Sequence, residues 1–150
     1  MKLAEALALR SDLQTQLVEL GKRLQHNARY QEGEEPAEDA ATLLAQVDRI
    51  TSELETLIVR VNVRNLATEV EPGLSLTAAL ARRDTLKTRH RQRTQLAEAA
   101  STPVDRYSRT ELRSIAAVNV RALRTEIDDL ARQIRELDTR IQGINWTTEL

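Results

Sequence analysis

The sequence contains no cysteine and no phenylalanine, and it has few residues that interrupt a helix. Without cysteine there is no disulfide framework, no thiol nucleophile and no thiolate metal site, which fits a reducing compartment. The aromatic residues are Tyr30, Tyr107 and Trp146. Because aromatic side chains bring the largest buried areas, we do not expect a broad globular core. With four glycines and three prolines in 150 residues, long elements are expected instead.

The chain also lacks a net charge of either sign and a long apolar run. Lys and Arg number 22 against 23 Asp and Glu, so no global field draws the protein to nucleic acid or to an anionic membrane. No uninterrupted apolar segment reaches the length of a signal peptide or a membrane span. We therefore expect one domain over residues 1–150, located in the cytoplasm, with no membrane contact.

The clearest pattern is an apolar stripe in the last quarter of the chain, which we call a seam. Its members alternate at steps of three and four residues: Val120, Leu123, Ile127, Leu130, Ile134, Leu137, Ile141 and Ile144. This spacing predicts a coiled-coil-like helix, capped by Asn119 and ending near Gly143. Charges of alternating sign indicate a solvent-facing side, at Arg124, Asp128, Arg132, Glu136 and Arg140.

Two further seams predict helices in the first half of the chain. The first helix, about residues 2–28, carries Leu3, Ala6, Arg10, Leu13, Leu17, Leu20, Leu24 and Asn27. Gly21 lies inside it and costs up to ~1 kcal/mol relative to alanine. After the acidic loop 31–39, Asp39 is the expected N-cap of a second helix that runs to about Thr68. Its seam is Leu43, Val47, Ile50, Leu54, Leu57 and Val61, with Leu44, Thr51, Ile58 and Asn65 beside it.

The third helix has the poorest seam. A turn at 71–73 precedes it, and it should run from Ser75 to about Ala100. Its seam would be Leu76, Ala79, Arg83, Leu86, His90, Arg93, Ala97 and Ala100. Residues 73–102 hold six basic and two acidic side chains, whereas 36–72 hold three basic and seven acidic ones. Opposite charges of this kind predict that the second and third helices dock side by side.

Periodicity lapses between the third and fourth helices, over about 104–118. We expect an irregular or β-hairpin excursion there, and the alternative is a helical turn, because Ser108 and Glu111 match a capping box. The predicted fold is therefore all-α, with four long antiparallel helices in a coiled-coil-like bundle.

No motif of a known catalytic or nucleotide-binding site appears in the sequence. His26 and His90 are far apart and have no clear carboxylate partner, so neither a metal nor a cofactor is predicted. The polar members of the seams are Arg10, Asn27, Arg64, Arg83 and His90. One interpretation is that these residues form polar layers that set the register between helices, with their long side chains extending to an acidic partner or to water. The other is an interior anion site formed by Arg10, Arg83 and His90, if the first and third helices are neighbours.

Two other candidate contacts follow from the charges and aromatics. The basic stretch 82–93, with Arg106, Tyr107 and Arg109, is a candidate anion or nucleic-acid patch, since basic clusters bind phosphates without reading sequence. Nucleic acid is not favoured, because a single aromatic gives little support for base stacking. Trp146 is expected to hold the tail against the bundle end or a neighbouring subunit; stacking on a ligand is the alternative.

The sequence favours a non-enzymatic structural or interaction protein. Because the third seam is poor while the second and fourth are rich, a monomer would leave apolar surface uncovered, and such surfaces usually become interfaces. A homo-oligomer is therefore expected, with a parallel dimer through the last helix as one arrangement. Contact with a different protein partner is the alternative. A catalytic role ranks third and would need the loops 31–39 and 105–111 to come together.

The chain resembles a small family of bacterial proteins, frequent in actinobacteria, that carry the label septicolysin. The similar segments are 1–7, 27–29, 31–39, 81–84, 105–109 and 145–148, with Asn62 and Asn65. The label implies a thiol-activated cytolysin. This sequence departs from that implication, since it has no cysteine and no long amphipathic β-hairpin for a pore. In this family a proline-containing extended segment stands where this chain has 115–117, which supports the extended prediction there.

Overall fold

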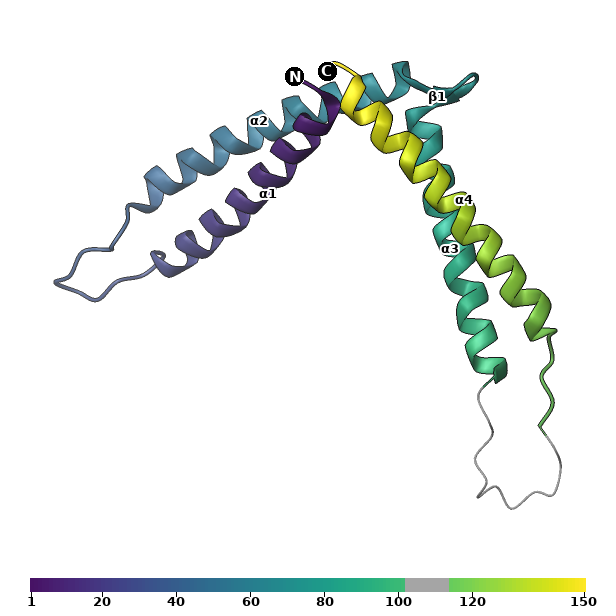
Figure 1. Ribbon diagram of the computed structural model, residues 1–150. Helices are drawn as coiled ribbons and strands as arrows, with labels where there is room; N and C mark the ends of the chain where they lie inside the picture. The colour runs from purple at the N-terminus through teal and green to yellow at the C-terminus, as the bar shows by residue number, and fades with distance from the viewer. Residues whose placement is uncertain (102–113) are drawn as a thin grey trace. The chain divides into compact units, whose positions relative to one another are not determined.

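The computed structural model describes residues 1–101 and 114–150, and within them the chain forms four long helices and one short hairpin (Figure 1). In chain order the elements are α1 (Leu3–His26), α2 (Ala40–Ala67), β1 (Glu69–Glu71), β2 (Leu74–Ser75), α3 (Leu76–Ser101) and α4 (Val120–Thr147). The helices pack antiparallel in pairs, which confirms the predicted all-α fold. The chain divides into two compact units: unit 1 is Met1–Ser75 with Gln142–Leu150, and unit 2 is Leu76–Ile141.

The core of unit 1 lies between α1 and α2, which run side by side (Figure 1). Their buried residues recur at steps of seven, with Ala6, Leu13 and Leu20 on α1, and Leu43, Ile50 and Leu57 on α2. This repeat keeps one stripe of each helix on its partner along the whole length. Each fully buried leucine or isoleucine contributes roughly 1.5–3 kcal/mol.

The loop between α1 and α2 ends in the predicted N-cap. The Asp39 carboxylate accepts hydrogen bonds from the backbone N–H groups of Thr42 at 2.8 Å and Ala41 at 3.4 Å. The Thr42 hydroxyl donates to the same carboxylate at 2.6 Å. These bonds, led by the hydroxyl, hold the pKa of Asp39 below its ordinary value, because they favour the charged form.

A β-hairpin joins α2 to α3, where the sequence predicted only a turn. β1 and β2 are antiparallel, and Glu71 pairs with Leu74. Gly73 has a φ of +80°, a conformation that residues with a Cβ rarely adopt, so glycine closes the turn. The hairpin or helical turn expected over 104–118 lies mostly outside the described residues, and 114–119 form neither helix nor strand.

The two ends of the described chain pair with each other in unit 1, and the termini lie together in Figure 1. The Leu3 N–H donates to the Thr148 carbonyl at 2.9 Å, and the Leu150 N–H donates to the Met1 carbonyl at 2.9 Å. Glu149 forms ion pairs with the Lys2 ammonium and the N-terminal ammonium, which together lower its pKa. Leu3 is completely buried, and the end of α4 belongs to unit 1 with it.

Unit 2 is the α3–α4 pair. Asn119 caps α4 as predicted, since its side-chain oxygen accepts from the Ala122 N–H at 3.1 Å. In the fourth seam only Leu137 and Ile141 are buried. The rest stay partly exposed: Val120, Leu123, Ile127, Leu130, Ile134 and Ile144. A single partner helix with a polar seam covers the α4 stripe incompletely.

Candidate functional site

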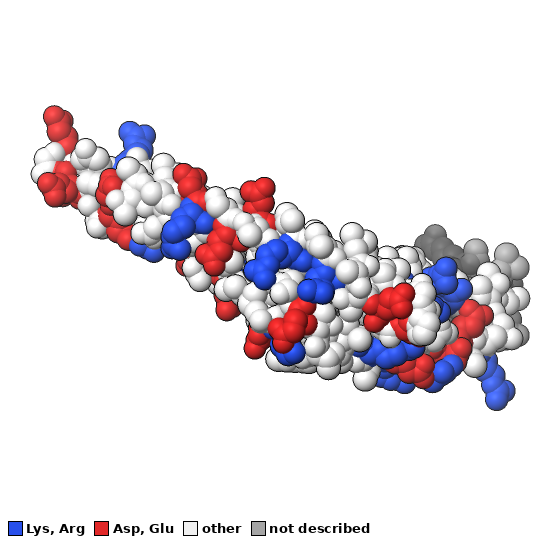
Figure 2. Space-filling model, turned by 90° about the horizontal axis from the view of Figure 1, so that it is seen from above, with Lys and Arg blue, Asp and Glu red and all other residues white. Residues whose placement is uncertain are grey.

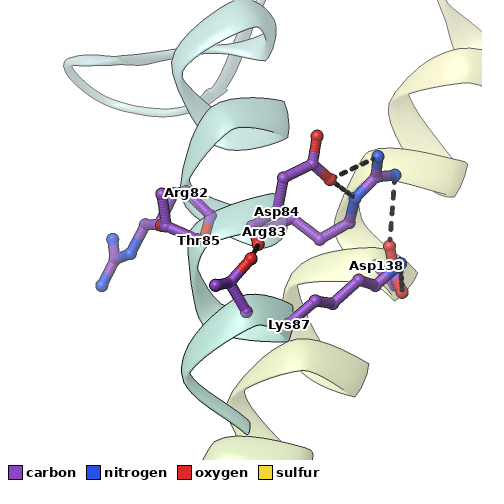
Figure 3. A network of polar contacts seen from close by, with 7 residues as sticks. Arg82, Arg83, Asp84, Thr85, Lys87 and Asp138 are labelled. Carbon is purple, nitrogen blue, oxygen red and sulfur yellow. Dashed lines mark hydrogen bonds and ion pairs between the residues drawn. The ribbon is translucent and has the colours of Figure 1, made fainter. Parts of the chain in front are cut away.

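Arg83, one of the predicted site residues, is the centre of a network of charges between α3 and α4 (Figure 3). Its guanidinium donates to Oδ1 of Asp84 at 3.1 and 3.0 Å, and to Oδ1 of Asp138 on α4 at 3.5 Å. The Lys87 Nζ lies 3.7 Å from the second oxygen of Asp138. The Arg83 side chain is 23% exposed. It therefore has the acidic partners that a half-buried charge at a seam position needs.

α4 supplies acidic partners to basic side chains of α3. Besides Asp138, Glu126 of α4 accepts a hydrogen bond from Arg93 Nε at 2.9 Å. The expected docking of the acidic second helix on the third stays a prediction, because α2 belongs to unit 1 and α3 to unit 2.

Three arginines on α3 remain outside this network, namely Arg82, Arg89 and Arg91. Arg82 points away from Arg83 and Asp138 in Figure 3, and Arg89 lies seven residues further along, on the same side of the helix. All three are exposed, and none forms an ion pair within the part of the chain that the structure describes. Arg82 and Arg89 are the two that share one side of α3 and could contact one anion together.

The other predicted anion-site residues lie in different parts of the chain. Arg10 belongs to unit 1, whereas Arg83 and His90 belong to unit 2, so the expected convergence of these three stays a prediction. Arg10 Nε is buried and has no hydrogen-bond partner among the described residues. Arg106, Tyr107 and Arg109 lie outside the described residues.

α2 also carries an exposed surface, apolar at its C-terminal end, that was not predicted from the sequence. It lies opposite the buried stripe, and we call it the outer face of α2, defined as Ala41, Ala45, Asp48, Ser52, Glu55, Val59, Val63 and Leu66. All eight residues are exposed, and Val59, Val63 and Leu66 reach 56, 62 and 67%. The signal was present in the sequence, because these positions also recur at steps of three and four.

The C-terminal part of this face borders a shallow groove of about 380 Å³ in unit 1. The groove is lined by Val59, Arg60, Val63, Arg64, Ala67 and Leu150. Arg60 donates to the carbonyl of Leu150 at 3.4 Å, which fixes one wall. The groove is thus lined by apolar side chains together with two arginines.

Trp146 also lies in unit 1, on the last turn of α4. Its side chain is 63% exposed, although its neighbour Asn145 is buried. The tail is held by the backbone bonds at Thr148 and Leu150. The predicted contact of Trp146 with a neighbouring subunit stays a prediction, and the exposed indole is available for it.

The surface carries both signs of charge in close alternation, and Figure 2 shows basic and acidic side chains interspersed over the visible face. Part of the predicted charge pattern on α4 is present, since Arg132 contacts Glu136 at 3.3 Å. Arg132 also pairs with Asp129 at 2.7 Å and lowers the pKa of that carboxyl. Within 1–101 and 114–150, no three His, Asp or Glu residues are grouped as metal ligands would be.

Comparisons with known proteins place the chain in a family whose function is unknown. The family model described as "Family of unknown function (DUF6847)" matches residues 10–150. The chain is also similar to a functionally unknown conserved protein from Corynebacterium diphtheriae, known from a crystal structure. That match has a TM-score of 0.94 and 38% sequence identity, and covers 100% of this chain and 98% of the other. No protein with a curated description matches at significance. No described helix is long and apolar enough to cross a membrane.

Proposed function

Because the chain belongs to the DUF6847 family, whose function is unknown, we propose a function from its surfaces: a non-enzymatic protein that self-associates through exposed helical faces. The observation that carries this proposal is the outer face of α2. Val59, Val63 and Leu66 are all more than half exposed on one side of one helix. A contiguous apolar surface of this kind is costly in water and usually marks a contact with another protein.

The incomplete cover of α4 supports the same proposal. Ile127, Leu130 and Ile134 continue a regular seam but remain partly exposed in unit 2. Leu130 lines a shallow groove of about 200 Å³ together with Arg93 and Glu126. A helix from another molecule would cover such a stripe, in the way that a third strand completes a coiled coil.

The titratable groups support a structural role rather than a catalytic one. Shifted pKa values point to candidate active sites, although ion-pair networks also produce them. Here the carboxyls with lowered pKa values each have a structural partner: Glu38 pairs with Arg23, Asp129 with Arg132 and Glu149 with Lys2, while Asp39 caps α2. These groups stabilise a loop, a helix cap, the surface of α4 and the chain ends.

Light scattering coupled to gel filtration tests the proposal. The chain has a mass of 17.0 kDa, so self-association predicts an integral multiple of that value, which decreases on dilution if the association is reversible. A mass of one chain at every concentration would refute the proposal. The measurement should be repeated at high salt, because contacts through apolar faces persist when charges are screened.

Anion binding at α3 is a second candidate, favoured by the exposed and unpaired Arg82 and Arg89. Such binding would be electrostatic and would weaken as salt is raised. Retention on heparin should decrease in the variant Arg82→Gln/Arg89→Gln. The control Arg121→Gln/Arg124→Gln removes the same charge from α4 and should be retained as the wild type is. Equal retention of the two variants would exclude this candidate.

The similarity to proteins labelled septicolysin does not extend the proposal to membrane lysis. A thiol-activated mechanism requires a cysteine thiol, and the sequence has none. Release of a dye from lipid vesicles would test this directly, and we expect no release above background.

A further inference from the structure

We infer that the outer face of α2 pairs antiparallel with the same face of a second copy of the chain, about a two-fold axis at the middle of the helix. This inference rests on the proposed self-association and names the surface that carries it. A two-fold contact uses one patch twice and therefore closes as a dimer. The helix has 28 residues, so the contact would extend over about 42 Å.

The position of the large apolar residues favours full-length overlap. Leu44, 52% exposed, lies beside the outer face near the start of α2, whereas Val59, Val63 and Leu66 lie near its end. If Ala40–Ala67 overlaps completely with its antiparallel copy, Leu44 lies opposite Val63 of the partner subunit. Ala41 then lies opposite Leu66 of the partner subunit. A small residue against a large one allows close packing without a void.

The order of charges along α2 selects the antiparallel orientation. Acidic residues occupy the first half and the middle, at Asp48, Glu53 and Glu55, and Arg60 and Arg64 follow. Antiparallel overlap places Asp48 within about one residue of the level of the partner subunit's Arg60. Parallel overlap would instead place Asp48 and Glu55 opposite their own copies, and like charges so placed are unfavourable.

Arg49 is the exception to this order, and it lies at the edge of the face, on the same side of the helix as Arg60. The centre of the face is polar, since Ser52 would lie opposite the partner subunit's Glu55. Polar layers of this kind weaken a helical contact but fix its register. The apolar ends supply the stability and the polar centre determines the alignment.

Site-specific cross-linking tests the orientation, and the absence of native cysteine makes it simple. In the variant Ser52→Cys, the two thiols lie near the axis, so a short bismaleimide should link two chains. In Ala41→Cys the thiols are 25 residues apart along the contact, roughly 37 Å, and should not be linked. Both positions are exposed on the same helix. Linking of both Ala41→Cys and Ser52→Cys would indicate a parallel pair, in which each residue lies opposite its own copy, and would overturn the inference.

A matched pair of charge insertions tests the surface itself. Val63→Glu places a charge in the outer face, and Val18→Glu places the same charge on α1; the two valines are 62 and 59% exposed. We expect Val63→Glu to weaken association at least ~10-fold, about 1.4 kcal/mol, and Val18→Glu to leave the mass unchanged. Circular dichroism should show that both variants remain helical.

The outcomes separate this inference from the proposed function. If the wild-type protein is a monomer, both the proposed self-association and the α2 contact are refuted. If the wild type is an oligomer, Val63→Glu does not dissociate it and Ser52→Cys is not cross-linked, only the α2 contact is refuted. Self-association would then use another face. Dissociation by Val63→Glu together with linking of Ser52→Cys alone is the expected result.

Discussion

The side-chain oxygen of Asn27 lies 3.0 Å from the backbone nitrogen of Glu38 and accepts its hydrogen bond. The amide group of the same side chain donates to the Arg23 carbonyl at 2.9 Å. Asn27 is 7% exposed, so both bonds are shielded from water. One side chain therefore ties the end of α1 to the segment that leads into α2, and the Arg23–Glu38 ion pair lies beside it.

Removal of this side chain should destabilise the protein. Asn27→Ala leaves the Glu38 N–H without its acceptor, whereas the Arg23 carbonyl keeps its bond from the backbone N–H of residue 27; an unsatisfied donor of this kind costs about 1–3 kcal/mol. The urea midpoint of unfolding, followed by circular dichroism, measures it. The control Asn62→Ala changes an exposed asparagine on α2 and should shift the free energy of unfolding by less than ~0.5 kcal/mol. Equal effects would contradict the role given to Asn27.

Replacement of glycine by alanine should have opposite signs at different positions. Gly21 and Gly143 lie inside α1 and α4, and no atom lies within 4 Å of the site where a Cβ would be added. Alanine at either position should stabilise by about 0.5–1 kcal/mol, because it restricts the unfolded chain.

Gly73→Ala is the comparison for this pair. Its φ of +80° is a conformation that alanine adopts only with strain, so this change should destabilise by ~1 kcal/mol or more. Thermal unfolding of the three single variants gives the answer. A lower midpoint for Gly21→Ala or Gly143→Ala would show that the helix has less space there than the structure indicates.

The cap at Asp39 should make stability sensitive to acid. Its folded-state pKa is lowered, chiefly by the Thr42 hydroxyl and then by the Thr42 and Ala41 N–H groups. The contribution of the charged cap is therefore complete above the ordinary aspartate pKa, about 3.9, and is lost as pH falls through the lowered folded value. Asp39→Asn keeps a capping side chain that does not titrate, so its urea midpoint should vary less with pH in this window.

A control separates the cap from the general effect of charge. Asp12→Asn removes an exposed carboxylate from α1 and should keep the pH dependence of the wild type. A second variant, Thr42→Ala, removes the hydroxyl that lowers the Asp39 pKa, so the loss of stability should begin at a higher pH. If the urea midpoint of Asp39→Asn changes with pH as that of the wild type does, the Asp39 cap is not the cause of the acid sensitivity.

The Arg83–Asp138 contact should contribute modestly and should depend on salt. Asp138 is 35% exposed and shares its two oxygens between Arg83 and Lys87. A double-mutant cycle with Arg83→Gln and Asp138→Asn should give a coupling energy of ~1 kcal/mol or less. The coupling should decrease as salt rises, because the Debye length falls from about 30 Å at 0.01 M to about 3 Å at 1 M. A coupling that salt does not alter would indicate a desolvated pair.

Local patterns in the sequence were sufficient for the helices and their caps. The steps of three and four residues located α1, α2, α3 and α4, and the N-caps Asp39 and Asn119 were identified by residue type alone. The turn at Gly73 was also predicted. These features depend on neighbours within one or two turns of the chain, so the sequence contains all the information that they require.

The ion-pair partners and the exposed faces of the helices could be identified only from the tertiary structure. The sequence did not identify Asp138 and Glu126 of α4 as the partners of Arg83 and Arg93 on α3. From the sequence, Asn27 was a polar residue at a seam position. Its hydrogen bond with the Glu38 N–H, which holds the loop between α1 and α2, could not be predicted. The sequence alone does not distinguish two stripes of similar spacing on α2, because only the packing of α1 determines which stripe is buried.

What the sequence determined by itself was therefore the set of helices, because apolar periodicity, capping residues and glycine positions act within single segments. The tertiary structure decided which stripe of each helix is buried and which remains exposed. It also placed the end of α4, through Thr148 and Leu150, against the start of α1. These choices depend on contacts between residues up to 149 positions apart, as in the bond from the Leu150 N–H to the Met1 carbonyl, and no local pattern specifies them.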